Sequence, residues 1–129
     1  MINEKFKLKK QNFEQALLQL IKVFKEPASE YIRDAAIQRF EFTYELSWKT
    51  LQAYLAAQDL IVLSPKETLK IAYEQGLIKD ASAWSELHMQ RNLTSQTYDQ
   101  KLAESVYHFL KEKGLQLFLE LQTSLNEKL

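Results

Sequence analysis

Polar side chains gather in one stretch of the chain, residues 84–99, which reads W-S-E-L-H-M-Q-R-N-L-T-S-Q-T-Y-D. It places a guanidinium at Arg91 and an amide at Asn92 before a run of hydroxyls, and it adds a second amide at Gln96 and a phenol at Tyr98. A guanidinium is planar and always charged, so it can bind a phosphate through two parallel hydrogen bonds, which hydroxyls and amides can complete. The stretch is therefore a candidate site for a phosphate or a nucleotide.

The same residue types also fit an ordinary helix end. An arginine in the last turn interacts favourably with the helix dipole, and the asparagine that follows Arg91 tolerates the left-handed conformation found after many helices. Thr97 can then cap the next helix. The spacing alone leaves both interpretations open.

A second candidate lies in the middle of the longest predicted helix, where Glu41, Glu45 and Lys49 recur every four residues. This spacing puts the three side chains on one helical face, next to an apolar stripe. One interpretation is a solvated face with favourable pairing, worth about 0.2–0.5 kcal/mol per pair. The other is a polar patch with Glu45 and Lys49 as binding residues, beside the aromatic rings of Tyr44 and Trp48, facing a groove or a second subunit.

The motifs of a self-sufficient enzyme are missing from the sequence, which has no glycine-rich phosphate loop, nucleophile elbow or HExxH pair. Its two histidines, His88 and His108, fall in different predicted helices, and there is no cysteine. This makes a metal site a weak hypothesis. His88 shares a helical face with Trp84 and Arg91 and can assist a phosphate site, although a single helical histidine is more often a surface or partly buried residue. We expect no metal site and assign no catalytic residue on these grounds.

The composition limits the function classes. The 129 residues include 17 basic and 17 acidic side chains, so the formal charge is zero, which argues against a non-specific nucleic-acid coat. The length predicts a single domain over residues 1–129. The sequence shows no signal-like start and no apolar run of membrane-spanning length, so we expect a cytoplasmic protein that does not enter a membrane. Only two glycines and two prolines occur, which favours helices over a turn-rich β fold.

Apolar residues recur at helical spacing in five segments, which predicts helices over residues 3–24, 30–57, 65–75, 80–91 and 99–127. Ser29, Ser64 and Asp80 are suitable N-caps for three of them, and Gly76 is a suitable residue to end the third. Gly114 inside the last segment predicts a local break. With short connections between them, these segments predict an all-α fold, an antiparallel up-and-down bundle of four to five helices.

Two segments resemble a known family. Residues 33–55 read R-D-A-A-I-Q-R-F-E-F-T-Y-E-L-S-W-K-T-L-Q-A-Y-L, and residues 64–99 contain, in order, S-P-K-E, G-L-I-K-D, W and R-N-L-T-S-Q-T-Y-D. Together they are similar to the nucleotidyltransferase substrate-binding proteins of bacteria, which belong to the HEPN superfamily. The resemblance covers residues 33–99, whereas the flanking helices add only their amphipathic pattern.

The resemblance implies a dimeric, HEPN-like bundle that partners a small, separately encoded nucleotidyltransferase of the minimal MNT type. The transferase would supply the NTP and Mg chemistry, and this chain, with no cofactor of its own, would bind the substrate or be the substrate. Pairs of this kind are also interpreted as toxin and antitoxin. In the dimer, the two copies of the polar stretch would face each other, so that two Arg91 side chains would make a positive cleft for a nucleotide or RNA.

HEPN chains of such pairs can also be metal-independent ribonucleases with an R-x4-H-x-Y motif. On this sequence the arginine of the motif falls on Arg91, the next residue on Asn92 and the tyrosine on Tyr98, but the histidine position holds Gln96. An amide cannot act as a general base, although it can bind a phosphate or a base. The resemblance therefore implies a non-catalytic binding subunit, with the ribonuclease, using Arg91, as the alternative. Tyr98 is also a candidate for nucleotidylation by the partner.

Overall fold

Helices form nearly all of the chain in the computed structural model, which describes residues 3–128. They are α1 (Glu4–Phe24), α2 (Glu30–Ala56), α3 (Pro65–Glu74), α4 (Ala81–Leu93), α5 (Gln100–Phe109) and α6 (Leu115–Asn126). No strand occurs among the described residues. The predicted all-α bundle is confirmed.

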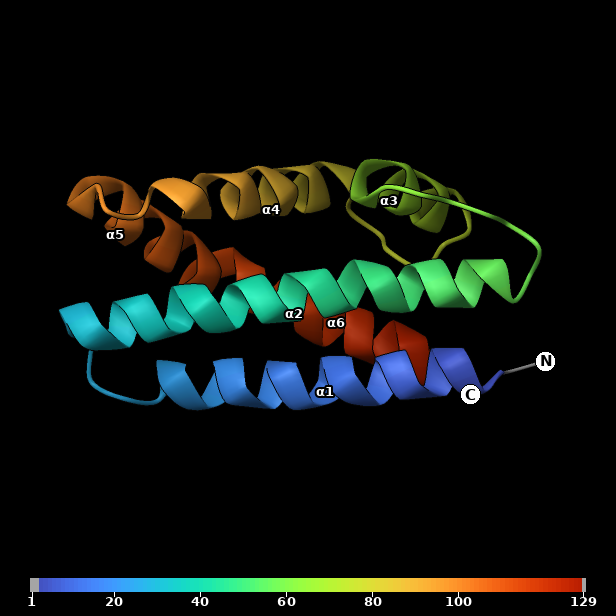
Figure 1. Cartoon of the computed structure of the whole chain (residues 1–129), viewed down its shortest axis with the longest axis horizontal. Helices are drawn as coiled ribbons and strands as arrows, with labels where there is room; N and C mark the ends of the chain where they lie inside the picture. Colours follow the sequence, from blue (N-terminus) through green and yellow to red (C-terminus); the bar gives the residue numbers. More distant parts are fainter. Residues whose placement is uncertain (1–2, 129) are drawn as a thin grey trace.

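Helix α2 lies at the centre of the bundle (Figure 1). Helix α1 runs antiparallel to it on one side and α4 runs antiparallel to it on the other, while α5 and α6 form one bent rod that crosses behind them. The short helix α3 lies near the C-terminal end of α2. Because α2 contacts α1, α3, α4 and α5, it fixes the position of the polar stretch, which is carried by α4 and the turn after it.

Three of the predicted N-caps are confirmed by hydrogen bonds. The side chain of Ser29 accepts from the backbone N–H of Ile32 at 3.1 Å, and that of Ser64 accepts from Glu67 at 3.2 Å. Asp80 Oδ1 accepts from the N–H of Ala83 at 2.9 Å. Each bond satisfies a backbone donor that the first helical turn leaves free.

Helix α4 continues beyond its predicted end at Arg91. It reaches Leu93, and a 3-10 turn, Thr94–Gln96, follows. The side chain of Thr97 donates to the carbonyl of Thr94 at 3.1 Å and does not cap α5. The cap is Asp99, whose carboxylate accepts from two backbone N–H groups of α5. Of the helix-end interpretation, the position of Arg91 in the last turn of α4 is confirmed, whereas Asn92 does not adopt the left-handed conformation and Thr97 does not cap the next helix.

The predicted break at Gly114 is confirmed as a π-helical turn, Leu110–Gly114, between α5 and α6. A Cβ atom at Gly114 would lie 3.0 Å from Leu110 Cδ2 and 3.4 Å from Leu87 Cδ1. Only the absence of a side chain lets this turn approach α4 so closely. The rod therefore bends without ending, and α6 reaches the N-terminal part of α4.

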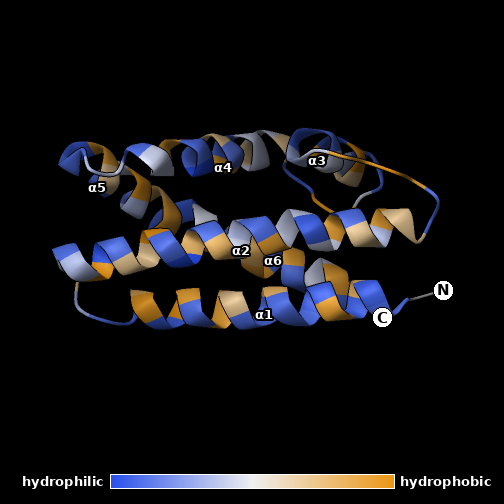
Figure 2. Cartoon of the chain, in the orientation of Figure 1, coloured by the Kyte–Doolittle hydropathy of each residue, from blue (hydrophilic) through white to orange (hydrophobic). Residues whose placement is uncertain are grey.

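Aromatic rings hold the helices in register. The ring of Phe118 on α6 lies 6.2 Å from Phe13 of α1, 6.2 Å from Phe40 of α2 and 5.9 Å from Trp84 of α4, measured between centroids. All four residues are at most 2 % exposed. Apolar and polar residues alternate along each helix (Figure 2), as expected when one face packs inward. This packing fixes the faces that α2 and α4 present to each other.

Within residues 3–128, no helix is long and apolar enough to span a bilayer.

Candidate functional site

The polar stretch contacts α2 through a triad of side chains. The guanidinium of Arg91 lies 3.5 Å from Glu41 Oε2. The hydroxyl of Thr94 bridges the two, because it accepts from Arg91 Nη1 at 2.9 Å and lies 2.9 Å from Glu41 Oε2. Thr94 Oγ1 also lies 2.7 Å from the carbonyl oxygen of Arg91. The one residue of the stretch that is permanently charged is thus joined to the longest helix.

The positive charge of Arg91 and the negative charge of Glu41 offset each other within this triad. A threonine hydroxyl has one hydrogen to donate, so Thr94 donates to either Glu41 or the Arg91 carbonyl while it accepts from the guanidinium. About a third of each charged side chain is exposed, 34 % for Arg91 and 33 % for Glu41. A phosphate that approaches from solvent can reach Arg91, because within residues 3–128 only Nη1 is engaged, but it must compete with the nearby negative charge of Glu41.

A second pair joins the same two helices one turn away. The phenol oxygen of Tyr44 lies 2.6 Å from Nδ1 of His88. Burial raises the pKa of Tyr44, and the charge of Glu45 raises it further, so the phenol keeps its proton. Burial, Lys66 and Arg91 lower the pKa of His88, which favours the neutral imidazole. We therefore assign Tyr44 as the donor and Nδ1 as the acceptor, which leaves the ring proton on Nε2.

The structure does not bring Glu45 and Lys49, predicted as binding residues, to Arg91. Glu45 Oε2 accepts from Trp48 Nε1 at 3.0 Å, one turn further along α2. Lys49 is half-buried and makes no ion pair with Glu45 within 4.0 Å. Among the three residues of that predicted face, Glu41 is the one that meets the polar stretch.

Tyr98 borders a hollow of about 440 Å³ between α2 and the turn after α4. The lining residues are Asp34, Ala35, Ile37, Gln38, Glu41, Thr94, Thr97 and Tyr98. The two charged members of this set, Asp34 and Glu41, are carboxylates. With 85 % of its surface exposed, Tyr98 is open to solvent. The lining of the hollow therefore does not attract a bare anion, and within residues 84–99 the positive charge comes from Arg91.

The side chains of Asn92 and Gln96 are exposed. Their backbone carbonyls hold the turn together, since that of Asn92 accepts from the Ser95 hydroxyl at 3.2 Å and that of Gln96 accepts from the N–H of Asp99 at 3.1 Å. Within the described residues, neither amide side chain bonds to Arg91. Both remain open to a ligand or to a second chain.

The sequence did not predict that Thr94 bridges Arg91 and Glu41 or that Tyr44 contacts His88. It placed Glu41 on the correct face of its helix but did not predict its pairing with Arg91. One local signal was available, because Thr94 follows Arg91 by three residues and such residues are neighbours on a helix. The contacts with Glu41 and Tyr44 depend on the register between α2 and α4. No spacing within one helix reports that register.

The described residues 3–128 contain no group of three or more His, Asp or Glu side chains that could hold a metal ion. The chemistry that the arrangement offers is binding of an anion by Arg91 with hydroxyl support, next to a neutral Tyr44–His88 pair. Gln96 lies where the R-x4-H pattern would place an imidazole, so the motif supplies no general base.

Comparison with known proteins assigns the family. A family model described as nucleotidyltransferase substrate binding protein like matches residues 8–127, nearly the whole chain. The chain belongs to this nucleotidyltransferase substrate-binding family. The match reaches all six helices that carry and surround the Arg91 triad, so the resemblance stated from residues 33–99 is confirmed and extends beyond them.

Two solved structures share the fold of this family member. A crystal structure of a Thermus thermophilus protein superposes with a TM-score of 0.80 and 38 % identity, covering 88 % of this chain and 98 % of that one. A Haemophilus influenzae protein, described as having the fold of a substrate binding domain of a nucleotidyltransferase, superposes with a TM-score of 0.66 and 31 % identity. That alignment covers 94 % of this chain and 96 % of the other.

A curated relative carries a different description. The probable ribonuclease HepT of Haemophilus influenzae is 43 % identical over 77 residues, which are 56 % of this chain. The match spans about half, 53 %, of the relative's length. The chain is thus similar both to a protein described as a substrate binding domain and to a protein described as a probable ribonuclease.

Proposed function

We propose that the chain is the non-catalytic, substrate- or nucleotide-binding subunit of a separately encoded minimal nucleotidyltransferase, acting in a toxin and antitoxin type of module. The observation that carries this proposal is Arg91, held by Glu41 and Thr94 in a motif whose histidine position is Gln96. Arginine with hydroxyl and amide neighbours binds phosphates, whereas the missing imidazole removes the base that RNA cleavage needs. The NTP and Mg would be bound by the transferase.

The proposal includes a homodimer whose two Arg91 sites face a common cleft. Two large apolar side chains support it, since Phe42 is 55 % exposed and Met89 is 54 % exposed. Each lies next to a residue of the site in sequence, Phe42 after Glu41 and Met89 after His88. Exposed apolar side chains beside a polar site are typical of an interface.

The partner is tested by co-expression with the cognate minimal nucleotidyltransferase, followed by affinity capture and size-exclusion chromatography with light scattering. We expect a stable complex that contains two copies of this chain. Phe42→Glu should split the pair of copies, whereas Leu8→Glu, at a side chain 56 % exposed on α1, should not. A transferase that never co-elutes with wild-type chain would overturn the proposal.

Tyr98 is the residue that we propose as an acceptor for the transferase. Its exposed phenol oxygen would attack the α-phosphorus of the NTP, so that a P–O bond to tyrosine forms, the phenol proton is lost and pyrophosphate leaves. The new phosphodiester would add negative charge beside Asp34 and Glu41 and compete with Glu41 for Arg91. Mass spectrometry after incubation with the transferase, Mg and ATP should show one nucleotidyl group, absent in Tyr98→Phe. An unmodified Tyr98 in an active transferase reaction removes this part of the proposal.

The second candidate function is a metal-independent ribonuclease, favoured by the relative described as a probable ribonuclease. It would use Arg91, with His88 supplying the imidazole that position 96 lacks. Expression of the chain alone would then arrest growth, and Arg91→Ala would relieve the arrest. If wild-type chain leaves RNA intact and Gln96→His creates cleavage, the binding function is supported. Cleavage by wild-type chain that His88→Gln abolishes would replace it with the ribonuclease.

A further inference from the structure

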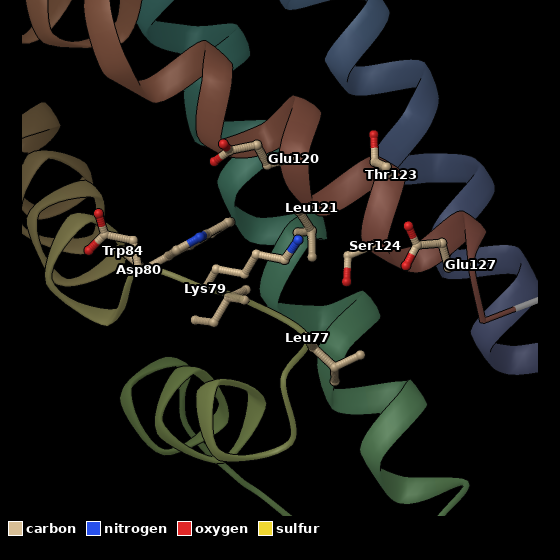
Figure 3. A pocket seen from close by; sticks show the side chains of 10 residues that line it. Leu77, Lys79, Asp80, Trp84, Glu120, Leu121, Thr123, Ser124 and Glu127 are labelled. Carbon is tan, nitrogen blue, oxygen red and sulfur yellow. The ribbon is translucent and has the colours of Figure 1, made fainter.

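A second hollow lies at the other end of α4, between the segment that joins α3 to α4 and the last turns of α6 (Figure 3). Its volume is about 160 Å³. The lining residues are Leu77, Ile78, Lys79, Asp80, Trp84, Glu120, Leu121, Thr123, Ser124 and Glu127. None of them belongs to the Arg91 site.

The floor of this hollow is apolar. Leu77, Ile78, Trp84 and Leu121 are each between 2 % and 4 % exposed, so their side chains are packed on every side except the one that faces the opening. A cavity of about 150 Å³ with apolar walls can hold a molecule the size of benzene. The hollow is therefore large enough for a branched aliphatic or single-ring group.

Trp84 brings a polar atom to this floor that has no partner. The residue is only 2 % exposed, and within residues 3–128 no group accepts a hydrogen bond from its indole N–H, which keeps some contact with solvent. The chain's other tryptophan, Trp48, donates its N–H to Glu45 at 3.0 Å. Because the Trp84 indole N–H has no protein partner in the described chain and remains accessible, it is a donor that a molecule bound in the hollow can use.

Two further donors, Ser124 and Lys79, border the hollow. Within residues 3–128 the hydroxyl of Ser124 donates no hydrogen bond, whereas that of its neighbour Thr123 donates to the carbonyl of Leu119 at 3.2 Å. Figure 3 shows the side chain of Lys79 extending across the hollow toward Leu121 and Ser124. In the described part of the chain, Lys79 forms no ion pair within 4.0 Å. Together with Trp84, these groups make a set of donors suited to a carboxylate.

The rim of the hollow also carries acids. Asp80 is engaged as the N-cap of α4, but Glu120 and Glu127 are not fully buried and, among the described residues, form no ion pair within 4.0 Å. A simple anion would be repelled by these two carboxylates, and a simple amine would leave the donors unsatisfied. A small molecule that carries a carboxylate and an ammonium group at one end can bind the donors with the first and face the two glutamates with the second.

We propose that this hollow binds a free α-amino acid with an apolar side chain of about the size of leucine. The carboxylate accepts from Lys79, Trp84 and Ser124, and the ammonium faces Glu120 and Glu127. The side chain of the amino acid lies on Leu77 and Leu121. This site is independent of the transferase and of Arg91.

The probe is L-leucine added to the full chain, followed in a ¹H–¹⁵N correlation spectrum. The chain has two tryptophans and therefore two indole N–H peaks, and Trp84→Phe assigns the one that belongs to the hollow. We expect that peak to shift saturably while the Trp48 peak stays. The matched compounds 3-methylbutylamine and 4-methylpentanoate each lack one charged group and should bind about tenfold more weakly, since each loses charge-assisted hydrogen bonds.

Neighbouring hydroxyls provide the control. Ser124→Ala removes a free donor and should weaken leucine binding several-fold, whereas Thr123→Val removes a hydroxyl that is already bonded to the backbone and should not. The site is overturned if leucine at millimolar concentration leaves the Trp84 peak unmoved. It is also overturned if both matched compounds bind as tightly as leucine, or if the two hydroxyl variants weaken binding equally.

Discussion

The polar side chains at the two ends of α4 differ in whether they have partners within the protein. About 10 Å of helix separates Trp84 from Arg91, at about 1.5 Å per residue. At the Arg91 end, the charged and hydroxyl groups are paired with one another through Glu41 and Thr94. At the Trp84 end, Asp80 and Thr123 are engaged, but the other donors and acids that border the hollow have no partner inside the described chain. We call the Arg91 site, where the polar groups are paired with one another, the closed end of α4, and the hollow at Trp84 the open end.

The difference predicts opposite effects of removing a side chain. At the closed end, Glu41 competes with a ligand for Arg91, so loss of that carboxylate should strengthen anion binding. At the open end, the polar groups without a protein partner, such as those of Lys79 and Ser124, are available to the ligand, so loss of any of these should weaken binding. Three kinds of variant test this difference. They change the packing beneath the middle of α4, ligand binding at one end, or the protonation of His88 at the closed end.

The largest effect is expected where both ends depend on one residue. Leu87 lies between Trp84 and Arg91, is fully buried and faces Gly114. Leu87→Ala should lower the free energy of unfolding by about 2–5 kcal/mol, because it leaves a cavity beneath the middle of α4. Urea unfolding measures this. Leu18→Ala, at a side chain 58 % exposed on α1, should change stability by less than about 0.5 kcal/mol, and equal losses would show that α4 is not anchored at Leu87.

The next effect separates the two ends. Arg91→Ala should reduce ATP binding at the closed end by about tenfold or more, since it removes charge-assisted hydrogen bonds to phosphate. Leucine binding at the Trp84 end should be unchanged. Calorimetric titration with each ligand measures both. The control is Arg39→Ala, because Arg39 donates to the backbone carbonyl of Gln19 on α1 at 2.7 Å, outside both sites. If Arg39→Ala lowers ATP affinity as much as Arg91→Ala, the closed end is not the anion site.

The smallest effect is a pH dependence at the closed end. Burial, Lys66 and Arg91 lower the pKa of His88 below its ordinary value, so the unfolded chain binds a proton more readily than the folded one. The stability that comes from neutral His88 is therefore present above about pH 6.5 and is lost as the pH falls below it, together with the bond from Tyr44. Unfolding measured from about pH 5 to pH 8 should show this slope, reduced in His88→Gln. An identical slope in the variant contradicts the assignment.

Local signals predicted the helices well, because caps and periodic apolar residues act within a few positions. Ser29, Ser64 and Asp80 cap as predicted, and Gly114 marks the bend. The predicted end of α4 at Arg91 was wrong, since the helix reaches Leu93 and a 3-10 turn follows. The apolar pattern from which helix ends are predicted is weak in this polar stretch.

The candidate site was only partly predictable. Arg91 and Tyr98 follow from residue type and the family resemblance, but the partner of Arg91 does not. Glu41 and Glu45 are equivalent by spacing, and only the packing of Phe40 and Trp84 on Phe118 decides which carboxylate meets α4. The open end was not predictable at all, since it joins residues 77–84 to residues 120–127 and depends on the bend at Gly114.

One titration series tests the central claim that Arg91 is an anion-binding residue held closed by Glu41. The affinity for ATP is measured by calorimetry, at fixed ionic strength, for wild-type chain, Glu41→Gln and Glu45→Gln. Both variants remove one carboxylate from the same helix, but only Glu41 is paired with Arg91, whereas Glu45 accepts from Trp48. We predict about fivefold tighter binding for Glu41→Gln, as expected for loss of a competing pair worth about 1 kcal/mol, and little change for Glu45→Gln. Equal affinities for the two variants, or weaker binding by Glu41→Gln, would contradict the account.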